Sequence, residues 1–150
     1  MPYIVEVDQS GKIEQSGPTV LAFSDGISHA ILVPSEVKTE GFHTLRKRGK
    51  SREIALLLLF SACLYLLLKG HLDQLQKVII DEEYTGQEDN IKSFLLEYAK
   101  RRGQFWEPER VDFARVGKGS PADKKARAVR EGKDKGYREI ALEELLELVE

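Results

Sequence analysis

Residues 54–68 read IALLLLFSACLYLLL, and this stretch decides the fold class of the chain. Leucine and alanine dominate it, and both favour a helix over a strand. Glu53 precedes the stretch, and Gly70 follows it at a place where a glycine commonly ends a helix. A helix that is apolar on nearly every face must be covered on nearly every face. We therefore expect this helix to lie against a β-sheet, with other elements over its back.

Short β-rich segments precede the helix. Residues 3–8 alternate in the manner of a strand with substantial burial. Thr19 to Phe23 and Ser28 to Val33 are rich in residues that favour strands, and Ser24-Asp25-Gly26 between them is a hairpin signal. These patterns predict three antiparallel strands before residue 35. A polar loop is expected to follow them and to end at Arg52.

Strand and helix patterns alternate after the central helix. Lys77 to Asp81 is typical of a short buried strand, and Val111 to Val116 of another. Between them, the spacing of Thr85 and Glu88 matches a capping box, and the apolar residues that follow share one helical face. This pattern predicts a helix that ends at Gly103.

The last part of the chain is predicted to be helical. Ser120-Pro121-Ala122-Asp123 offers a serine cap, a proline in the first turn and an acid at the third position. Residues 140–149 predict a short amphipathic helix with an acidic face. The element order is β-β-β-α-β-α-β-α plus this C-terminal helix. It predicts an α/β fold with a mixed five-stranded sheet and helices on both faces.

Composition limits the classes of protein that the chain can belong to. Its 150 residues predict a single domain, with a core over about 3–130 and the acidic helix at about 140–149. With 32% charged and 41% hydrophobic residues, the chain resembles soluble globular proteins, and a net charge of −2 excludes a generic polycation. The single cysteine, Cys63, excludes an intramolecular disulfide and argues against a cysteine-built zinc site.

The expected location is the cytoplasm. The opening segment is acidic where a secretion signal would be basic. The longest apolar run is shorter than the roughly 18–20 residues that cross a bilayer. We therefore expect no membrane association.

Carboxylates occur where such a sheet would gather them. Asp8 ends the first predicted strand, Asp81 ends a later one, and Glu53 and Asp123 each begin a helix. In open α/β sheets, ligands bind beyond the strand ends. Carboxylates are hard oxygen ligands that suit Mg²⁺ or Mn²⁺. The four residues are therefore our candidates for metal ligands and catalytic groups.

At these positions the chain resembles the ribonuclease H-like superfamily, and most closely type 1 ribonuclease H. The resemblance covers roughly residues 3 to 130 and rests on four motifs in matching order: Asp8-Gln9-Ser10, Ser51-Arg52-Glu53, Val78-Ile79-Ile80-Asp81 and Gly117-Lys118-Gly119-Ser120-Pro121-Ala122-Asp123. It implies Mg²⁺- or Mn²⁺-dependent hydrolysis of nucleic-acid phosphodiester bonds by two metal ions, for example in the RNA strand of RNA–DNA hybrids. Asp8 and Asp81 would be shared ligands, and Glu53 and Asp123 would each complete one metal site.

Two alternatives remain on the same fold. One is a non-catalytic nucleic-acid-binding module, and the other is a structure-specific DNA resolvase. Double-stranded RNA and branched DNA therefore stay beside RNA–DNA hybrids as candidate substrates.

Basic residues predict where a nucleic-acid partner would bind, because phosphate contacts supply most non-specific affinity. They form two clusters that flank proposed carboxylates, one before the central helix and one around the last loop and helix. The first comprises Arg46, Lys47, Arg48, Lys50 and Arg52, and the second is centred on Lys118, Lys124 and Lys125.

Overall fold

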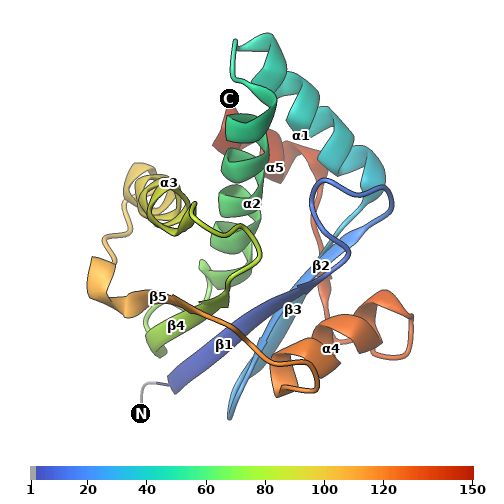
Figure 1. Cartoon of the computed structure of the whole chain (residues 1–150), viewed down its shortest axis with the longest axis vertical. Helices are drawn as coiled ribbons and strands as arrows, with labels where there is room; N and C mark the ends of the chain where they lie inside the picture. The colour runs from blue at the N-terminus through green and yellow to red at the C-terminus, as the bar shows by residue number, and fades with distance from the viewer. Residues whose placement is uncertain (1–2) are drawn as a thin grey trace.

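The computed structural model describes residues 3–150, which fold around one mixed β-sheet of six strands (Figure 1). The strand order is β5-β4-β1-β2-β3-β6. In chain order the strands are β1 (Tyr3–Ser10), β2 (Thr19–Ser24), β3 (Ser28–Val33), β4 (Leu75–Asp81), β5 (Val111–Ala114) and β6 (Arg138–Glu139).

The first three strands are antiparallel, as the hairpin signal predicts, while β4 runs parallel to β1 and β5 runs parallel to β4. The sixth strand corrects the prediction of five. β6 pairs in parallel with β3 over only two residues, Arg138 and Glu139, too short a segment to leave a strand pattern in the sequence.

Five α-helices surround the sheet. They are α1 (Ser35–Lys47), α2 (Arg52–Leu68), α3 (Glu88–Arg101), α4 (Pro121–Arg130) and α5 (Leu142–Val149), and a short 3₁₀ turn at Pro108–Arg110 precedes β5. Within residues 3–150, no helix combines the length and the apolar character that a bilayer crossing requires.

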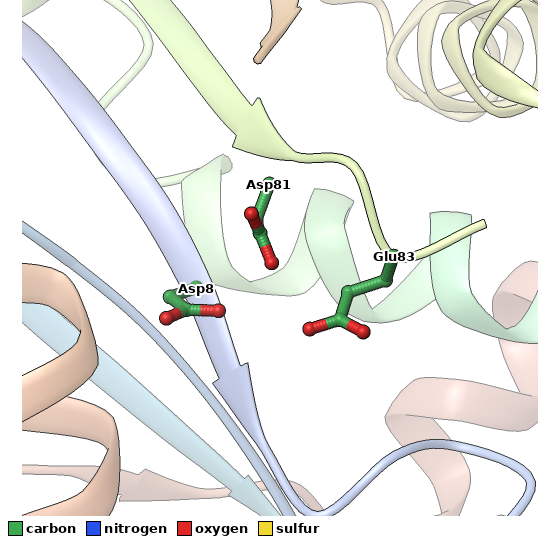
Figure 2. Close-up of side chains that lie close together, drawn as sticks. All are labelled: Asp8, Asp81 and Glu83. Carbon is green, nitrogen blue, oxygen red and sulfur yellow. The ribbon is translucent and has the colours of Figure 1, made fainter. Parts of the chain in front are cut away.

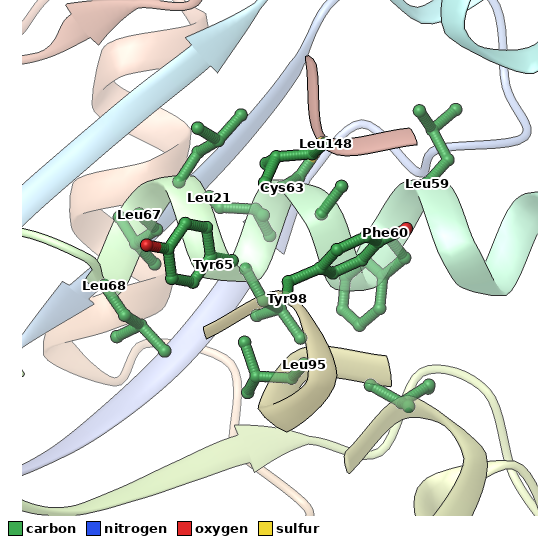
Figure 3. Packing of buried hydrophobic residues seen from close by; sticks show 14 of the residues in the cluster. Leu21, Leu59, Phe60, Cys63, Tyr65, Leu67, Leu68, Leu95, Tyr98 and Leu148 are labelled. Carbon is green, nitrogen blue, oxygen red and sulfur yellow. The ribbon is translucent and has the colours of Figure 1, made fainter. Parts of the chain in front are cut away.

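The apolar helix predicted from residues 54–68 is α2, and it forms the centre of the main core. Ser51 caps it by accepting a hydrogen bond from the Ile54 N–H at 3.2 Å. Figure 3 shows side chains of β2 (Leu21), α3 (Leu95) and α5 (Leu148) around it. Each buried leucine contributes on the order of 1.5–3 kcal/mol, so this cluster is the main apolar source of stability.

Strand β2 contributes to apolar clusters on both faces of the sheet, because successive side chains of a strand point to opposite sides. Leu21 and Phe23 join the main core under α2. Val20 and Ala22 join a smaller cluster on the other face. The partners in that cluster come from β3 and α4, and they are Ala30, Ala126 and Val129. Helices therefore cover both faces of the sheet.

Helix α1 corrects the prediction of a polar loop before Arg52. The buried residues Val37, Gly41 and Leu45 recur every four positions, which is a helical spacing. The signal is weak because one of the three is a glycine and Lys38 is also buried. A Cβ at Gly41 would lie 2.8 Å from Leu145 of α5, so the glycine permits close packing of two helices.

The start of helix α3 corrects the prediction of a capping box formed by Thr85 and Glu88. It begins at Glu88 without a side-chain cap, and the Glu88 carboxylate accepts a hydrogen bond from the Gly86 N–H at 3.0 Å. The capping box expected from Thr85 does not form, because Thr85 lies in a turn two residues before the cap position.

Candidate metal centre

The pairing of β1 with β4 places two aspartates side by side. Val7 pairs with Ile80, and both side chains enter the core under α2. The next residues along the two parallel strands are Asp8 and Asp81, so their side chains face the opposite side of the sheet, the side that α4 covers. Neighbouring strands lie about 4.8 Å apart, which brings the two carboxylates within reach of one ion.

A third carboxylate joins them from the segment after β4. Ligand atoms of Asp8, Asp81 and Glu83 all lie within 4.8 Å of one another (Figure 2). A divalent cation binds carboxylate oxygens at roughly 2.0–2.6 Å, so two oxygens on opposite sides of the ion lie about 4–5 Å apart. Among residues 3–150, these three form the one cluster of acidic, histidine or cysteine side chains that could hold an ion. We refer to them below as the carboxylate triad.

Asp8 is the buried member of the carboxylate triad, with 7% of its surface exposed. One of its oxygens accepts a hydrogen bond from the neighbouring Gln9 N–H at 2.8 Å. Burial raises the pKa of Asp8 to about 7, the Gln9 hydrogen bond opposes this rise, and the charges of Asp81, Asp123 and Glu83 add to it. None of the ion pairs among the described residues includes Asp8. A buried carboxylate without a cationic partner favours a proton or a metal ion.

The other two members are held by neighbouring segments. Asp81 accepts a hydrogen bond from the Val116 N–H at 2.7 Å, which anchors the loop between β5 and α4. Glu83 lies 3.8 Å from the Lys12 ammonium in the β1–β2 loop. Burial and then the neighbouring Asp81 raise the pKa of Glu83, while Lys12 lowers it. The carboxylate triad therefore connects three loops of the molecule.

Asp123 lies near the carboxylate triad without being part of it. It occupies the first turn of α4, where its N–H donates to the Ser120 hydroxyl at 3.1 Å, as the sequence predicts. Its carboxylate accepts a hydrogen bond from the Gly119 N–H at 2.7 Å and pairs with Arg127. Its charge contributes to the raised pKa of Asp8, which shows that the two carboxylates are electrostatic neighbours.

Glu53 lies apart from the carboxylate triad. Its carboxylate is exposed in the first turn of α2 and accepts a hydrogen bond from the Gln87 amide at 3.2 Å. The α2 residue that does border the triad is Phe60, which lines a small cavity with all three carboxylates. Phe60 is seven residues further along α2, or about 10 Å at 1.5 Å per residue. The role of Glu53 as a ligand therefore stays a prediction.

Glu83 is the site residue that the sequence analysis missed. The run Asp81-Glu82-Glu83 has the composition of an exposed acidic loop, and Glu82 is indeed exposed. A turn after β4, in which the Glu83 N–H donates to the Asp81 carbonyl at 2.9 Å, distinguishes the two glutamates. The only sequence signal for Glu83 was its spacing of two residues from Asp81. In an extended segment, this spacing places two side chains on the same side.

The basic clusters lie at opposite ends of the long axis of the molecule. The α1–α2 connection, which carries Arg46, Lys47, Arg48, Lys50 and Arg52, is at the top of Figure 1, and α4 is near the bottom. Arg48 donates to the Val149 carbonyl, and the Arg52 guanidinium lies 5.9 Å from the centre of the Phe42 ring. In the second cluster, Lys118 and Lys124 are exposed, whereas Lys125 pairs with Asp134 at 2.8 Å. Phosphate binding by either cluster stays a prediction.

Comparison with known proteins adds no assignment, because no family model, curated protein or solved structure matches the chain. The geometry of the site is therefore the basis of the functional argument.

Proposed function

We propose that this protein is a metal-dependent nuclease of ribonuclease H-like type that hydrolyses phosphodiester bonds of nucleic acids. The observation that carries the proposal is the carboxylate triad, in which Asp8 and Asp81 come from adjoining parallel strands and Glu83 completes the group within 4.8 Å. The element order also supports it, because three antiparallel strands are followed by alternating helices and parallel strands. The resemblance to that superfamily rests on a similar order of elements that lacks α1 and β6.

The residues present fit a divalent cation. All three ligands offer hard carboxylate oxygens, which suit Mg²⁺ or Mn²⁺ better than softer metals. The buried charge of Asp8 has no cationic partner among the described side chains, so a bound cation would neutralise it. Such an ion supplies an activated water at neutral pH and stabilises charge on phosphoryl oxygens. Asp8, Asp81 and Glu83 would hold it.

Asp123 is the candidate that would complete a second metal site. It neighbours Asp8 electrostatically, and it already binds Arg127 and the Gly119 N–H, so its orientation is defined. In the two-metal proposal it would help to hold a second cation beside Asp8, while Asp8, Asp81 and Glu83 would hold the first.

Nucleic acid is the proposed substrate class. Lys118 and Lys124 are exposed on either side of Asp123, where they would contact phosphates next to the carboxylates. The RNA strand of an RNA–DNA hybrid is the substrate that the resemblance implies. Lys118 and Lys124 would add salt-sensitive affinity without selecting a sequence.

Cleavage of labelled oligonucleotides tests the proposal. Purified protein is incubated with Mg²⁺ or Mn²⁺ and an RNA–DNA hybrid, double-stranded RNA or branched DNA, and the products are separated on a denaturing gel. We expect Asp8→Asn and Asp81→Asn to reduce cleavage at least 100-fold while oligonucleotide binding persists.

Asp112→Asn is the matched control, because Asp112 is an exposed aspartate of the same sheet that pairs with Lys77 outside the triad. It should cleave like the unmodified protein. If the unmodified protein binds these substrates but cleaves none of them with either metal, the chain is a binding module and the proposal is overturned.

A further inference from the structure

A cavity of about 330 Å³ lies between the β1–β2 loop, the start of α1 and the first half of α2, and no member of the carboxylate triad lines it. The loop and α1 lie side by side in Figure 1. The Lys38 ammonium joins them by donating to the Lys12 and Gln15 carbonyls at 3.3 and 2.8 Å. Small-molecule sites commonly occupy roughly 300–1,000 Å³, so this cavity has room for a small ligand. We refer to it below as the α1–α2 cavity.

Two cationic side chains, Lys38 and Arg52, line the α1–α2 cavity, and neither forms an ion pair within residues 3–150. Lys38 is buried, with 5% of its surface exposed, and its ammonium also donates to the Thr19 hydroxyl at 3.1 Å. All its hydrogen-bond acceptors are neutral, so no counter-charge cancels the buried cation. Arg52 is exposed at the start of α2, so its guanidinium is accessible to a ligand.

One acid, Glu14, also lines the α1–α2 cavity and opposes part of this positive charge. Glu14 is exposed, and its carboxylate accepts a hydrogen bond from the Tyr84 hydroxyl at 3.0 Å, away from the two cations. The first turn of α1, which contributes Ser35 to the lining, has no side-chain cap, so the positive end of the helix dipole adds to the cations. The charges of the lining therefore favour an anion.

Four apolar side chains complete this part of the lining. Ile13 and Leu59 are buried, and Phe42 and Leu56 are half-buried. The Arg52 guanidinium lies 5.9 Å from the centre of the Phe42 ring, so the cationic and apolar parts of the cavity adjoin. A bare inorganic anion would leave the apolar surface uncovered, whereas a ligand with an apolar body would bury it.

We infer that the α1–α2 cavity binds a small organic anion, in which a phosphate or carboxylate group beside Arg52 is joined to an apolar ring against Phe42 and Leu56. Arginine binds both kinds of anion through paired hydrogen bonds. Lys38 contributes through its charge, because its three protons are engaged by the loop and Thr19. This inference does not depend on the proposed nuclease function, because no residue of the carboxylate triad takes part in it.

NMR titration of the ¹⁵N-labelled protein in EDTA tests the inference without any metal. The probes are phenyl phosphate and benzoate, which join an anion to a ring, inorganic phosphate, which lacks the ring, and benzylamine, which carries the opposite charge. Arg52→Gln removes the exposed cation of the cavity. Arg115→Gln is the matched control, because Arg115 is an exposed arginine that does not line the cavity and forms no ion pair among the described residues.

We expect phenyl phosphate or benzoate to shift the amide signals of residues that line the α1–α2 cavity, and to bind about 10-fold more tightly than inorganic phosphate or benzylamine. The tighter of the two identifies the anionic group that the cavity prefers. Arg52→Gln should weaken its binding about 10-fold, because a hydrogen bond to an ionised group is lost. Arg115→Gln should bind it like the unmodified protein.

Three results would overturn the inference: no shift of these signals by either ring-bearing anion at millimolar concentration, equally tight binding of benzylamine, or unweakened binding by Arg52→Gln. The proposed nuclease function would stand in each case, because it depends on the carboxylate triad and is tested by cleavage with Mg²⁺ or Mn²⁺.

Discussion

Asp8→Asn should stabilise the metal-free protein while removing one ligand of the proposed metal site. Burial raises the pKa of Asp8 from 3.8 to about 7, and this difference corresponds to about 4 kcal/mol at 1.36 kcal/mol per pKa unit. Solvent reaches the partly exposed Asp81 and Glu83 beside it, and this screening reduces the expected effect to about 2 kcal/mol. Asparagine keeps the acceptor for the Gln9 N–H and has no charge to bury.

The sign of the pH dependence follows from the raised pKa. The folded protein binds a proton at Asp8 more tightly than the unfolded chain does, so this contribution to stability is fully present below pH 3.8. It is lost as the pH rises towards 7, and above about 7 it is absent. The gain from Asp8→Asn should therefore be about 1 kcal/mol near pH 5 and about 2 kcal/mol near pH 8.

Urea denaturation in EDTA at the two pH values measures this gain, with Asp112→Asn as the exposed control that stays within about 0.5 kcal/mol of the unmodified protein. Adding Mg²⁺ or Mn²⁺ should stabilise the unmodified protein and leave Asp8→Asn unchanged. An Asp8→Asn variant that is no more stable than the unmodified protein near pH 8 would refute the reasoning, because it would show that the buried charge carries no penalty.

Three further predictions concern the fold. Gly11→Ala should lower the free energy of unfolding by about 3 kcal/mol or more, because the glycine has φ +78° and a Cβ would lie 2.5 Å from a backbone carbonyl oxygen. Gly49→Ala, at φ +85° with open space around it, should cost only about 1 kcal/mol in the same urea titration, and equal losses would contradict the steric argument. Burial raises the pKa of the Cys63 thiol to about 12, so a thiol reagent near pH 8 should label it only after denaturation, and rapid labelling of the folded protein would show that α2 is exposed. Burial, and next the contact with His71, lower the pKa of His29, so stability should fall as the pH drops below 6.5, and His29→Gln should flatten this slope in thermal melts; an unaltered slope would assign it to other groups.

The sequence predicts the parts of the fold that depend on local patterns. The hairpin strands and α2 follow from residue types and spacing, and their positions in the structure agree closely with the prediction. Helix α1 was not predicted, because its buried face includes Gly41. The glycine lets α5 pack closely against α1, and no local sequence pattern encodes that contact. β6 depends on pairing with a distant strand and has no pattern of its own.

The residues of the candidate site also fall into those that sequence patterns identify and those that only the structure identifies. Asp8 and Asp81 were identifiable because each lies close to the end of an apolar strand, and strand pairing then brings them together. Glu83 joins them through a turn, and Glu53 is separated from them by the distance along α2, so both outcomes depend on three-dimensional geometry. Phe60 is the residue of α2 that lines the small cavity with the triad. A single sequence does not reveal which turn of a helix lies nearest to a site.

The small cluster beneath α4 gives that helix a degree of independence. Its fully buried side chains are only alanines and valines, so lifting α4 from the sheet exposes far less apolar surface than disturbing the leucine-rich packing around α2. Asp123 and Lys124 lie on α4 and Lys118 lies in the loop before it, whereas Asp8 and Asp81 lie in the strands. The main core therefore carries Asp8 and Asp81 in its strands, while α4, packed by smaller side chains, carries Asp123 and its neighbouring lysines and is joined to the triad through the bond between Asp81 and the Val116 N–H.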